Sequence, residues 1–223
     1  MPLPAEIVPR TPRAGDKDIV LVMVPGMGMQ EADFRTRGLI AAAEQPGGPV
    51  ACVPVDPGPD SYLDGSVEAR LLDSIDAAQR ATGAKRVWLA GISLGCQAIL
   101  RCVRSRTGLA EGLLLLTPYL ASTGLIAEVV QAGGLLPWAA ANPDGPQPDR
   151  SFLTWLATTP MPPTLVGRAH HDRFATTATL LADLLPPGRV VSVAGEHDWT
   201  SWDRLWRLML EQDPFGQQRT SIA

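Results

Sequence analysis

Short, continuous apolar runs that stop at turn residues recur along the chain and constrain its fold more than any other feature. Six such runs are present: Ile19–Val24, Val50–Val55, Arg86–Ala90, Gly112–Leu116, Thr164–Val166 and Val190–Ala194. Segments with helical spacing of apolar residues alternate with them: Glu31–Glu44, Tyr62–Thr82, Leu94–Arg106, Phe174–Leu185 and Trp199–Gln212. This alternation is typical of a parallel sheet covered on both faces. The sequence therefore predicts a doubly wound α/β fold, with a mostly parallel six-stranded sheet and helices on both faces.

The length fits one domain, but one connection is unusually long. A chain of 223 residues can form a full hydrophobic core, and we expect a single domain over residues 1–223. About 45 residues separate the fourth predicted strand from the fifth, far more than an ordinary connection needs. Within them GLIAEVVQAGG and DRSFLTWLATTP read as short helices, and PWAAANPDGPQPD reads as loop. We expect residues 118–162 to form a small, partly helical lid-like insertion.

The overall charge argues against nucleic acid as a partner. The formal net charge of −4 provides no basic field for phosphate backbones or anionic lipid. The three cysteines cannot form a complete set of disulfides, which favours a reducing compartment. The first residues lack the apolar core of a signal peptide, and no apolar run is long enough for a membrane span. We expect a cytoplasmic protein, and the sequence leaves its oligomeric state open.

The stretch VWLAGISLGCQAIL changes abruptly from a strand pattern to a helix pattern at a serine. Ser93 stands at the corner, with Gly91 and Gly95 two residues to either side in the pattern G-x-S-x-G. Such glycines let a strand and a helix approach closely around a residue in a strained conformation. The corner lifts the hydroxyl clear of both elements, at a helix N-terminus that favours a developing negative charge. Ser93 is therefore the candidate nucleophile, and an ordinary helix N-cap is the alternative.

A serine hydroxyl needs a base that removes its proton, and histidines follow two of the predicted strands. His197 lies in VSVAGEHDW, just past the last strand, while His170 and His171 lie in LVGRAHHDRF, past the fifth. Ligands of an open parallel sheet bind outside the carboxyl ends of its strands, which is where these loops lie. We take His197 as the candidate base and expect surface roles for His170 and His171.

A carboxylate must hold the histidine, and Asp172 in the same loop as the paired histidines is the first candidate. With it, the three groups follow the order serine, acid, histidine, each beyond a different strand. Asp172 has an alternative role as the cap of the helix that follows it. In that case Asp144 in the long connection or Asp56 after the second strand would be the acid.

These three loops resemble those of the α/β-hydrolase family, and the resemblance runs from about Ile19 to Gln212. The elbow GISLG, the acid loop GRAHHD and the histidine loop GEHDW match in kind, order and spacing. The resemblance implies that Ser93 is the nucleophile, that His197 is the general base and acid, and that Asp172 orients the histidine.

The resemblance also implies an oxyanion hole. The family uses the amide that follows the nucleophile and one that follows an early core strand, which gives Leu94 and Met27 in VPGMGM. The sequence departs from the family at Pro25, where many members have histidine, and at Cys96, where many have a second glycine. Two strands that usually lead the sheet are missing as well. We expect Cys96 to be a small buried filler and not a second nucleophile.

The expected function is hydrolysis of a small-molecule carboxylic ester or thioester through an acyl-enzyme. It requires no metal and no organic cofactor, and no metal-ligand pattern such as H-E-x-x-H is present. Phe152 and Trp155 in the expected lid and Met29 after the first strand are candidates for an apolar acyl pocket, although Met29 fits equally well beneath its own loop. Acyl transfer to an acceptor other than water, and a non-catalytic binding protein on the same scaffold, are the alternatives.

Overall fold

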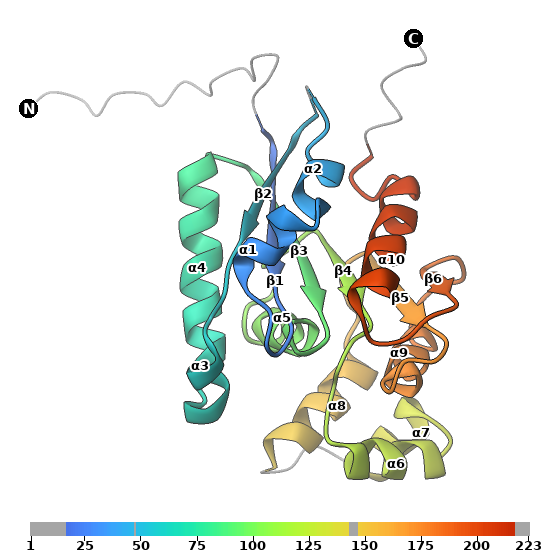
Figure 1. Ribbon diagram of the computed structural model, residues 1–223. Coiled ribbons are helices and arrows are strands. Elements are labelled where there is room, and N and C mark those ends of the chain that lie inside the picture. Colours follow the sequence, from blue (N-terminus) through green and yellow to red (C-terminus); the bar gives the residue numbers. More distant parts are fainter. Residues whose placement is uncertain (1–16, 47, 143–146, 217–223) are drawn as a thin grey trace, which may run out of the picture.

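A parallel β-sheet forms the centre of the computed structural model, which describes residues 17–46, 48–142 and 147–216 (Figure 1). The described strands are β1 (Ile19–Val24), β2 (Val50–Pro54), β3 (Arg86–Ile92), β4 (Gly112–Leu116), β5 (Thr164–Ala169) and β6 (Val190–Val193). They form a six-stranded sheet in the order β2-β1-β3-β4-β5-β6, in which all neighbours are parallel. The predicted α/β fold is confirmed, and β3 and β5 extend further than expected.

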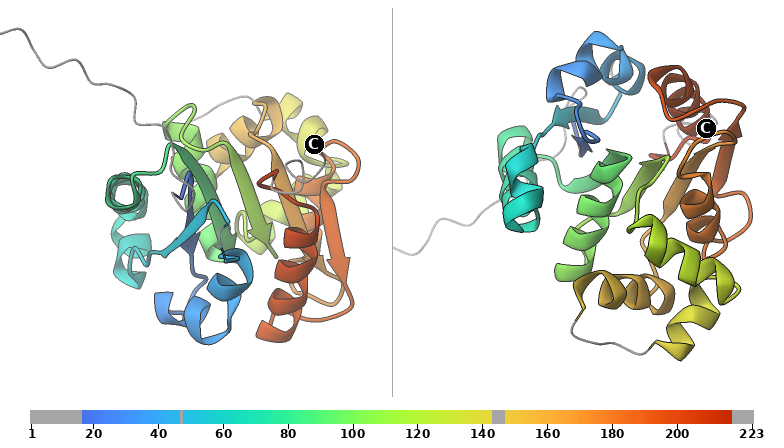
Figure 2. Two further views of the ribbon diagram at one scale, coloured as in Figure 1. Left: turned by 90° about the horizontal axis from the view of Figure 1, so that it is seen from above. Right: turned by 60° about the horizontal axis from the view of Figure 1, so that its bottom comes forward.

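Helices cover both faces of this sheet (Figure 2). The described helices are α1 (Glu31–Thr36), α2 (Leu39–Ala43), α3 (Pro59–Asp64), α4 (Val67–Thr82), α5 (Leu94–Ser105), α6 (Thr123–Gln131), α7 (Leu135–Ala141), α8 (Pro148–Thr158), α9 (Ala175–Ala182) and α10 (Trp199–Glu211). Side chains of β1 alternate between the two faces, as the pleat of a strand requires. Val20 and Val22 are buried in the cluster that includes α4, α5, α8 and α9, whereas Ile19 and Leu21 are buried against α1, α2 and α10.

The strand order changes direction between β1 and β3, and this positions the candidate site. The chain runs from β1 outward to β2 and then returns to β3 on the other side of β1. Val24 pairs in register with Gly91, so the loops that follow β1 and β3 leave the sheet side by side. Open parallel sheets bind ligands in the crevice outside such a switch point.

Two glycines divide helices that the sequence predicts as continuous. Gly38 separates α1 from α2 and Gly65 separates α3 from α4, each with a φ of 77°. This angle lies in the left-handed region, which ends an α-helix and which glycine adopts at low cost. The predictions of unbroken helices are wrong at these two points.

The long connection between β4 and β5 contains more helix than predicted. α6 and α8 correspond to the two predicted helices, but α7 covers residues that the sequence predicts as loop. Pro137 does not prevent this helix because it lies in the first turn, where the backbone N–H has no intrahelical partner. α6 and α7 lie below α9 in Figure 1, and Leu136 of α7 lines a cavity together with Thr164, the first residue of β5. Within the described ranges no single helix is long and apolar enough to cross a membrane; α6 and α7 meet that test only as a pair bent by 91°.

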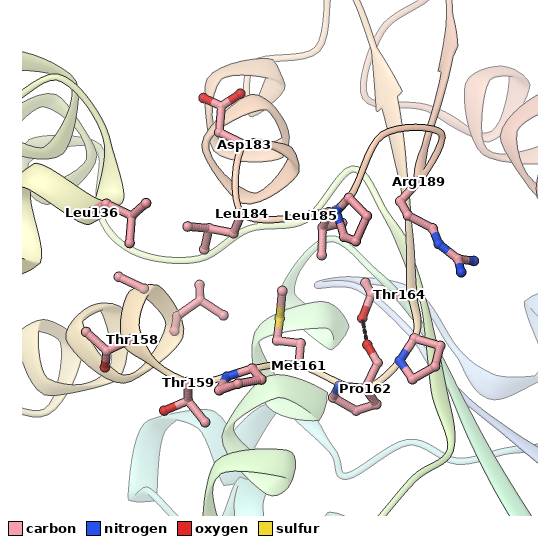
Figure 3. A pocket seen from close by; sticks show the side chains of 15 residues that line it. Leu136, Thr158, Thr159, Met161, Pro162, Thr164, Asp183, Leu184, Leu185 and Arg189 are labelled. Carbon is pink, nitrogen blue, oxygen red and sulfur yellow. Dashed lines mark hydrogen bonds between the residues drawn. The ribbon is translucent and has the colours of Figure 1, made fainter.

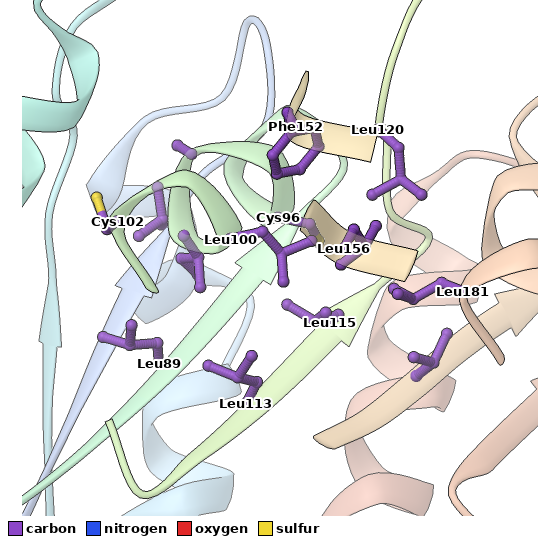
Figure 4. Close-up of a cluster of buried hydrophobic side chains, with 14 of the residues drawn as sticks. Leu89, Cys96, Leu100, Cys102, Leu113, Leu115, Leu120, Phe152, Leu156 and Leu181 are labelled. Atoms are coloured by element: carbon purple, nitrogen blue, oxygen red, sulfur yellow. The ribbon is translucent and has the colours of Figure 1, made fainter. Parts of the chain in front are cut away.

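α8 packs beside α5 and does not lie over the carboxyl end of the sheet. The Arg101 guanidinium of α5 donates a 2.6 Å hydrogen bond to Asp149 and lies 4.9 Å from the centroid of the Phe152 ring. Phe152 and Leu156 are buried in the apolar cluster shown in Figure 4. The expectation of a lid over residues 118–162 is therefore wrong for α8, because the core uses the apolar face of this helix.

Candidate active site

Ser93 occupies the sharp corner between β3 and α5. Its backbone has φ 53° and ψ −115°, a conformation that a non-glycine residue seldom adopts. A Cβ on Gly91 would lie 2.8 Å from the Cys96 nitrogen, and a Cβ on Gly95 would lie 2.4 Å from the Val24 oxygen. Both positions therefore require glycine so that the helix can approach the sheet. This close packing accounts for the two glycines that flank the serine.

The structure brings Ser93, His197 and Asp172 into one hydrogen-bonded series. The His197 Nε2 atom lies 2.9 Å from Ser93 Oγ, and its Nδ1 atom lies 2.6 Å from Asp172 Oδ2. Because a carboxylate only accepts hydrogen bonds, Nδ1 carries the proton and donates it, which leaves Nε2 free to accept from the serine hydroxyl. The Asp172 side chain is 1% exposed, so water does not compete for this contact. The arrangement can deprotonate the Ser93 hydroxyl.

Asp172 is fixed by its own loop as well as by the histidine. Its Oδ1 atom accepts a 2.6 Å hydrogen bond from the Phe174 amide at the start of α9, while Oδ2 faces His197. The capping role and the contact with the histidine thus coexist in one side chain. Asp56, the alternative after β2, accepts from the Gly58 amide, and Asp144 lies outside the described residues.

Aromatic rings hold the His197 imidazole on two sides. The Phe174 ring lies 4.9 Å from it and the Trp202 ring 5.1 Å, each nearly perpendicular to the imidazole. Trp202 Nε1 in turn donates a 2.9 Å hydrogen bond to Thr117 Oγ1, directly after β4. Trp202 belongs to α10, which the sequence predicts as a helix, but the sequence identifies no role for Phe174 or Thr117. The position of Thr117 directly after a strand was the available signal.

The loop after β1 lies against the nucleophile. A Cβ on Gly26 would be 3.1 Å from Ser93 Cβ, so this loop passes within contact distance of the serine. Met29 folds back onto the loop, and its Sδ atom accepts a 3.3 Å hydrogen bond from the Gly26 amide. The Met27 side chain is 69% exposed, and Leu94 is the first residue of α5. Roles for the Met27 and Leu94 amides as oxyanion donors, and for Met29 in substrate binding, stay predictions.

Phe152 and Trp155 lie away from Ser93. Phe152 is 0% exposed, and the Trp155 ring stacks on it with 6.0 Å between centroids. Trp155 lines a cavity of about 270 Å³ together with Leu109 and Ala110, which precede β4. That cavity lies at the amino end of the strand, whereas Ser93 follows the carboxyl end of β3. The prediction that these two aromatic side chains bind substrate is wrong, because α8 turns them toward the core.

A cavity of about 600 Å³ lies at the same amino end (Figure 3). Its walls come from Leu136 of α7, residues 156–164, residues 183–186 after α9, and Arg189 before β6. In its floor Thr164 Oγ1 donates a 2.7 Å hydrogen bond to the Pro162 carbonyl. Because β5 and β6 begin here, the length of the sheet separates this cavity from Ser93, and it is not a candidate for the reaction.

The remaining titratable candidates do not join the series. Cys96 is buried with its Sγ atom 3.1 Å from the Gly91 carbonyl, and burial raises the pKa of its thiol far above the usual range. It is a core filler, as expected. His170 and His171 are exposed, and each donates its backbone amide to the strand or loop next to it. No group of three His, Cys, Asp or Glu side chains in the described ranges is placed to hold a metal ion.

Comparison with known proteins points to one family. The sequence model of the family described as "Alpha/beta hydrolase family" matches residues 15–223 of the chain. A search of curated proteins gives no match.

Several solved structures resemble most of the chain. The S-formylglutathione hydrolase FrmB from Staphylococcus aureus superposes with a TM-score of 0.63 at 14% identity, over 87% of this chain and 80% of that one. Est1E from Butyrivibrio proteoclasticus gives 0.58 at 17% identity, over 89% of both chains. The RedJ thioesterase from Streptomyces coelicolor gives 0.51 at 19% identity, over 94% and 96%. At these identities the likeness shows the fold alone.

Proposed function

Because the chain belongs to the alpha/beta hydrolase family, we propose that it is a serine hydrolase of carboxylic esters or thioesters. Ser93 is the nucleophile, His197 the general base and acid, and Asp172 the group that orients the imidazole. The observation that carries the proposal is the hydrogen-bonded series from Ser93 Oγ through His197 to the buried Asp172 carboxylate.

Acylation begins at the strained corner after β3. As Ser93 Oγ bonds to the substrate carbonyl carbon, its proton passes to His197 Nε2, 2.9 Å away. The carbonyl oxygen becomes negative, and the amides of Leu94 and Met27 are the proposed donors that stabilise it. The bond to the leaving oxygen or sulfur then breaks, and that atom takes the proton from Nε2.

Deacylation repeats these steps with water as the nucleophile. His197 removes a proton from the water molecule as its oxygen attacks the acyl carbon, and the proton returns to Ser93 Oγ when the acid is released. Asp172 stabilises the imidazolium that forms in both halves, and the Phe174 and Trp202 rings keep the imidazole in place between them. Acyl transfer differs only in the acceptor, and these residues serve it equally well.

Two of the structural relatives support the choice of substrate class. One solved structure contains ferulic acid bound to Est1E, and RedJ is a thioesterase of the prodiginine biosynthetic pathway. We extend ester or thioester chemistry from them to this chain as part of the proposal. We also propose a single domain over residues 1–223, and a cytoplasmic location because Cys52, Cys96 and Cys102 are free thiols.

Labelling with a fluorophosphonate tests the proposal. The probe should modify Ser93 alone, as peptide mass spectrometry would show, and the wild-type protein should hydrolyse short p-nitrophenyl esters. Ser93→Ala should abolish labelling and lower kcat by at least about four orders of magnitude. Ser74→Ala on the surface of α4 is the matched control and should change neither. A Ser93→Ala variant that still hydrolyses esters at the wild-type rate would exclude Ser93 as the nucleophile.

A further inference from the structure

Two cavities adjoin along helix α9, and together they form what we call the α9 groove. The first, of about 360 Å³, has Phe174 and residues of α6 in its wall. The second, of about 480 Å³, has Arg168 and His170 in its wall. Val130 and Thr176 line both cavities, so the two cavities adjoin at these side chains.

The near end of the α9 groove begins beside the triad. Phe174 forms part of its wall, while the same ring packs 4.9 Å from the His197 imidazole. Ala121, Ile126 and Val130 make this end mostly apolar, and Arg173 lies at its edge with its guanidinium 5.0 Å from the Phe174 ring centroid. The cavity therefore offers a mostly apolar surface beside Phe174, next to the imidazole that faces Ser93.

The far end carries a guanidinium that the described chain leaves incompletely bonded. Arg168 Nη1 donates a 3.2 Å hydrogen bond to Thr179 Oγ1, but its buried Nε atom has no hydrogen-bond partner among the described residues. Asp183 lines the same cavity, is exposed and makes no ion pair with Arg168 within the described ranges. A buried donor without an acceptor costs free energy, which an acceptor supplied by a ligand would recover.

The separation of the two ends sets the size of the ligand. Phe174 and Thr179 are five positions apart along α9, which is about 7.5 Å at the helical rise of 1.5 Å per residue. A chain of roughly six atoms would span this length, and the part of the substrate between Ser93 and Phe174 adds to it. Carboxylate and phosphate groups both offer the paired oxygen atoms that suit a guanidinium.

We propose that the α9 groove selects esters or thioesters with a carboxylate or phosphate several bonds from the scissile carbonyl, and that Arg168 determines this preference. The inference rests on the proposed hydrolysis at Ser93 and defines its substrate class. The anionic group belongs either to the acyl portion or to the leaving alcohol or thiol, and both place the same charge opposite Arg168.

Two matched substrate pairs test the inference. The acyl pair is the p-nitrophenyl ester of hexanoic acid and the mono-p-nitrophenyl ester of adipic acid. The leaving-group pair is the hexanoyl thioester of pantetheine and that of phosphopantetheine. In at least one pair the wild-type protein should give a kcat/KM at least about tenfold higher for the charged member, in line with a hydrogen bond to a charged group. The pair that responds identifies which portion of the substrate occupies the groove.

Arg168→Met should reduce that preference to near unity, and Arg168→Lys should keep part of it because the charge remains. Arg189→Met is the matched control, since this arginine lines the separate cavity at the amino end of the sheet and should not alter the preference. Val130→Glu places a negative charge within the groove. Because this charge repels an anionic substrate group, the variant should invert the preference while Arg168 stays unchanged. Circular dichroism and thermal midpoints show whether each variant is folded.

Binding of adipate, hexanoate and hexyl phosphate by calorimetry separates failure of this inference from failure of the proposed function. Equal hydrolysis rates for both members of each pair, together with equal binding, would contradict the proposed role of the α9 groove. The proposed hydrolase activity would be unaffected. If no substrate is hydrolysed, the proposed function fails. The groove then stands only if adipate or hexyl phosphate binds at least about tenfold more tightly than hexanoate and loses that advantage in Arg168→Met.

Discussion

The turns that follow the neighbouring strands β3 and β4 share one strained backbone feature but use it differently. Ser93 after β3 has φ 53° and Thr117 after β4 has φ 42°, and both side chains are buried. The turns are joined, because the Ser93 amide donates a 3.0 Å hydrogen bond to the Leu116 carbonyl. The Ser93 hydroxyl faces the imidazole of His197, whereas the Thr117 hydroxyl accepts a hydrogen bond from Trp202.

The two turns use their strained backbone for different purposes at this edge of the sheet. At β3 the strained corner directs a reactive hydroxyl toward its base. At β4 it directs a supporting hydroxyl toward the indole that packs against that base from another side. Strained residues persist only where the surrounding contacts hold them in place. Here the hydrogen bond from the Ser93 amide to the Leu116 carbonyl joins the two turns. Substitutions should therefore affect chemistry most at the first turn and its partners, and less at the second.

The largest effect is expected at the acid that serves the β3 turn. Asp172→Asn removes the charge that stabilises the imidazolium and allows the wrong tautomer of His197. The corresponding change in serine proteases lowers kcat by about four orders of magnitude. We expect a loss of that order in p-nitrophenyl ester hydrolysis, with KM little changed.

Asp56→Asn is the control for this prediction, since Asp56 accepts only from a turn amide after β2 and should keep full activity. Asp144→Asn should likewise be active. A severe loss in either control, with Asp172→Asn active, would show that the acid is misassigned.

A smaller but still large effect is expected where the β3 turn touches the sheet. Gly95→Ala would place a Cβ 2.4 Å from the Val24 carbonyl oxygen and 2.6 Å from that of Pro25, both backbone atoms that cannot move aside cheaply. Helix α5 must shift and carry Ser93 with it, and a displacement near 1 Å typically costs about a hundredfold in rate. Steady-state kinetics should show this loss, and thermal unfolding should show a stability lower by about 2 to 3 kcal/mol. Gly124→Ala, which meets no atom within 4 Å, is the control.

An intermediate effect is expected at the β4 turn. Thr117→Val keeps the shape of the side chain but leaves the buried Trp202 N–H without its acceptor, at a cost of about 1 to 3 kcal/mol. The indole then holds His197 less firmly, and we expect kcat to fall about tenfold while KM stays nearly constant. Thr117→Ser retains the hydroxyl and should restore most of the rate. Equal losses in the two variants would show that Thr117 acts through packing and not through Trp202.

The two turns also show what the sequence can and cannot predict. The β3 turn was predictable residue by residue, because the cause of its strain is local: two glycines flank Ser93 within five positions. Asp172 and His197 follow from their places after strands. Thr117 also follows a strand directly, but its partner Trp202 lies 85 residues away, and only the fold brings the two together.

For a related reason, the sequence does not predict where the helices between β4 and β5 pack. Their apolar spacing indicated that α8 must pack on something, but the sequence does not say on which surface. In the structure α8 packs against α5, where Arg101 contacts Asp149 and Phe152. Likewise the unpaired Nε of Arg168 is visible only once β5 and α9 lie together.

The smallest effect is expected at the second nucleophilic atom of the β3 turn, the Cys96 thiol. It lies one helical turn after Ser93, but burial raises the pKa of this thiol, and its Sγ atom donates to the Gly91 carbonyl. Only the thiolate is reactive, so the native protein should not react at Cys96 with a disulfide reagent at pH 8. Burial also raises the pKa of Cys52 and of Cys102 to about 12, so all three thiols should become titratable only after denaturation.

Cys96→Ala should keep kcat within about twofold and lower the free energy of unfolding by about 1 kcal/mol, since it removes one buried atom. Fluorophosphonate labelling should be unchanged in this variant. Rapid modification of native Cys96, with loss of ester hydrolysis that Cys96→Ala abolishes, would show that the thiol is open to the site and that the turn after β3 presents two reactive groups.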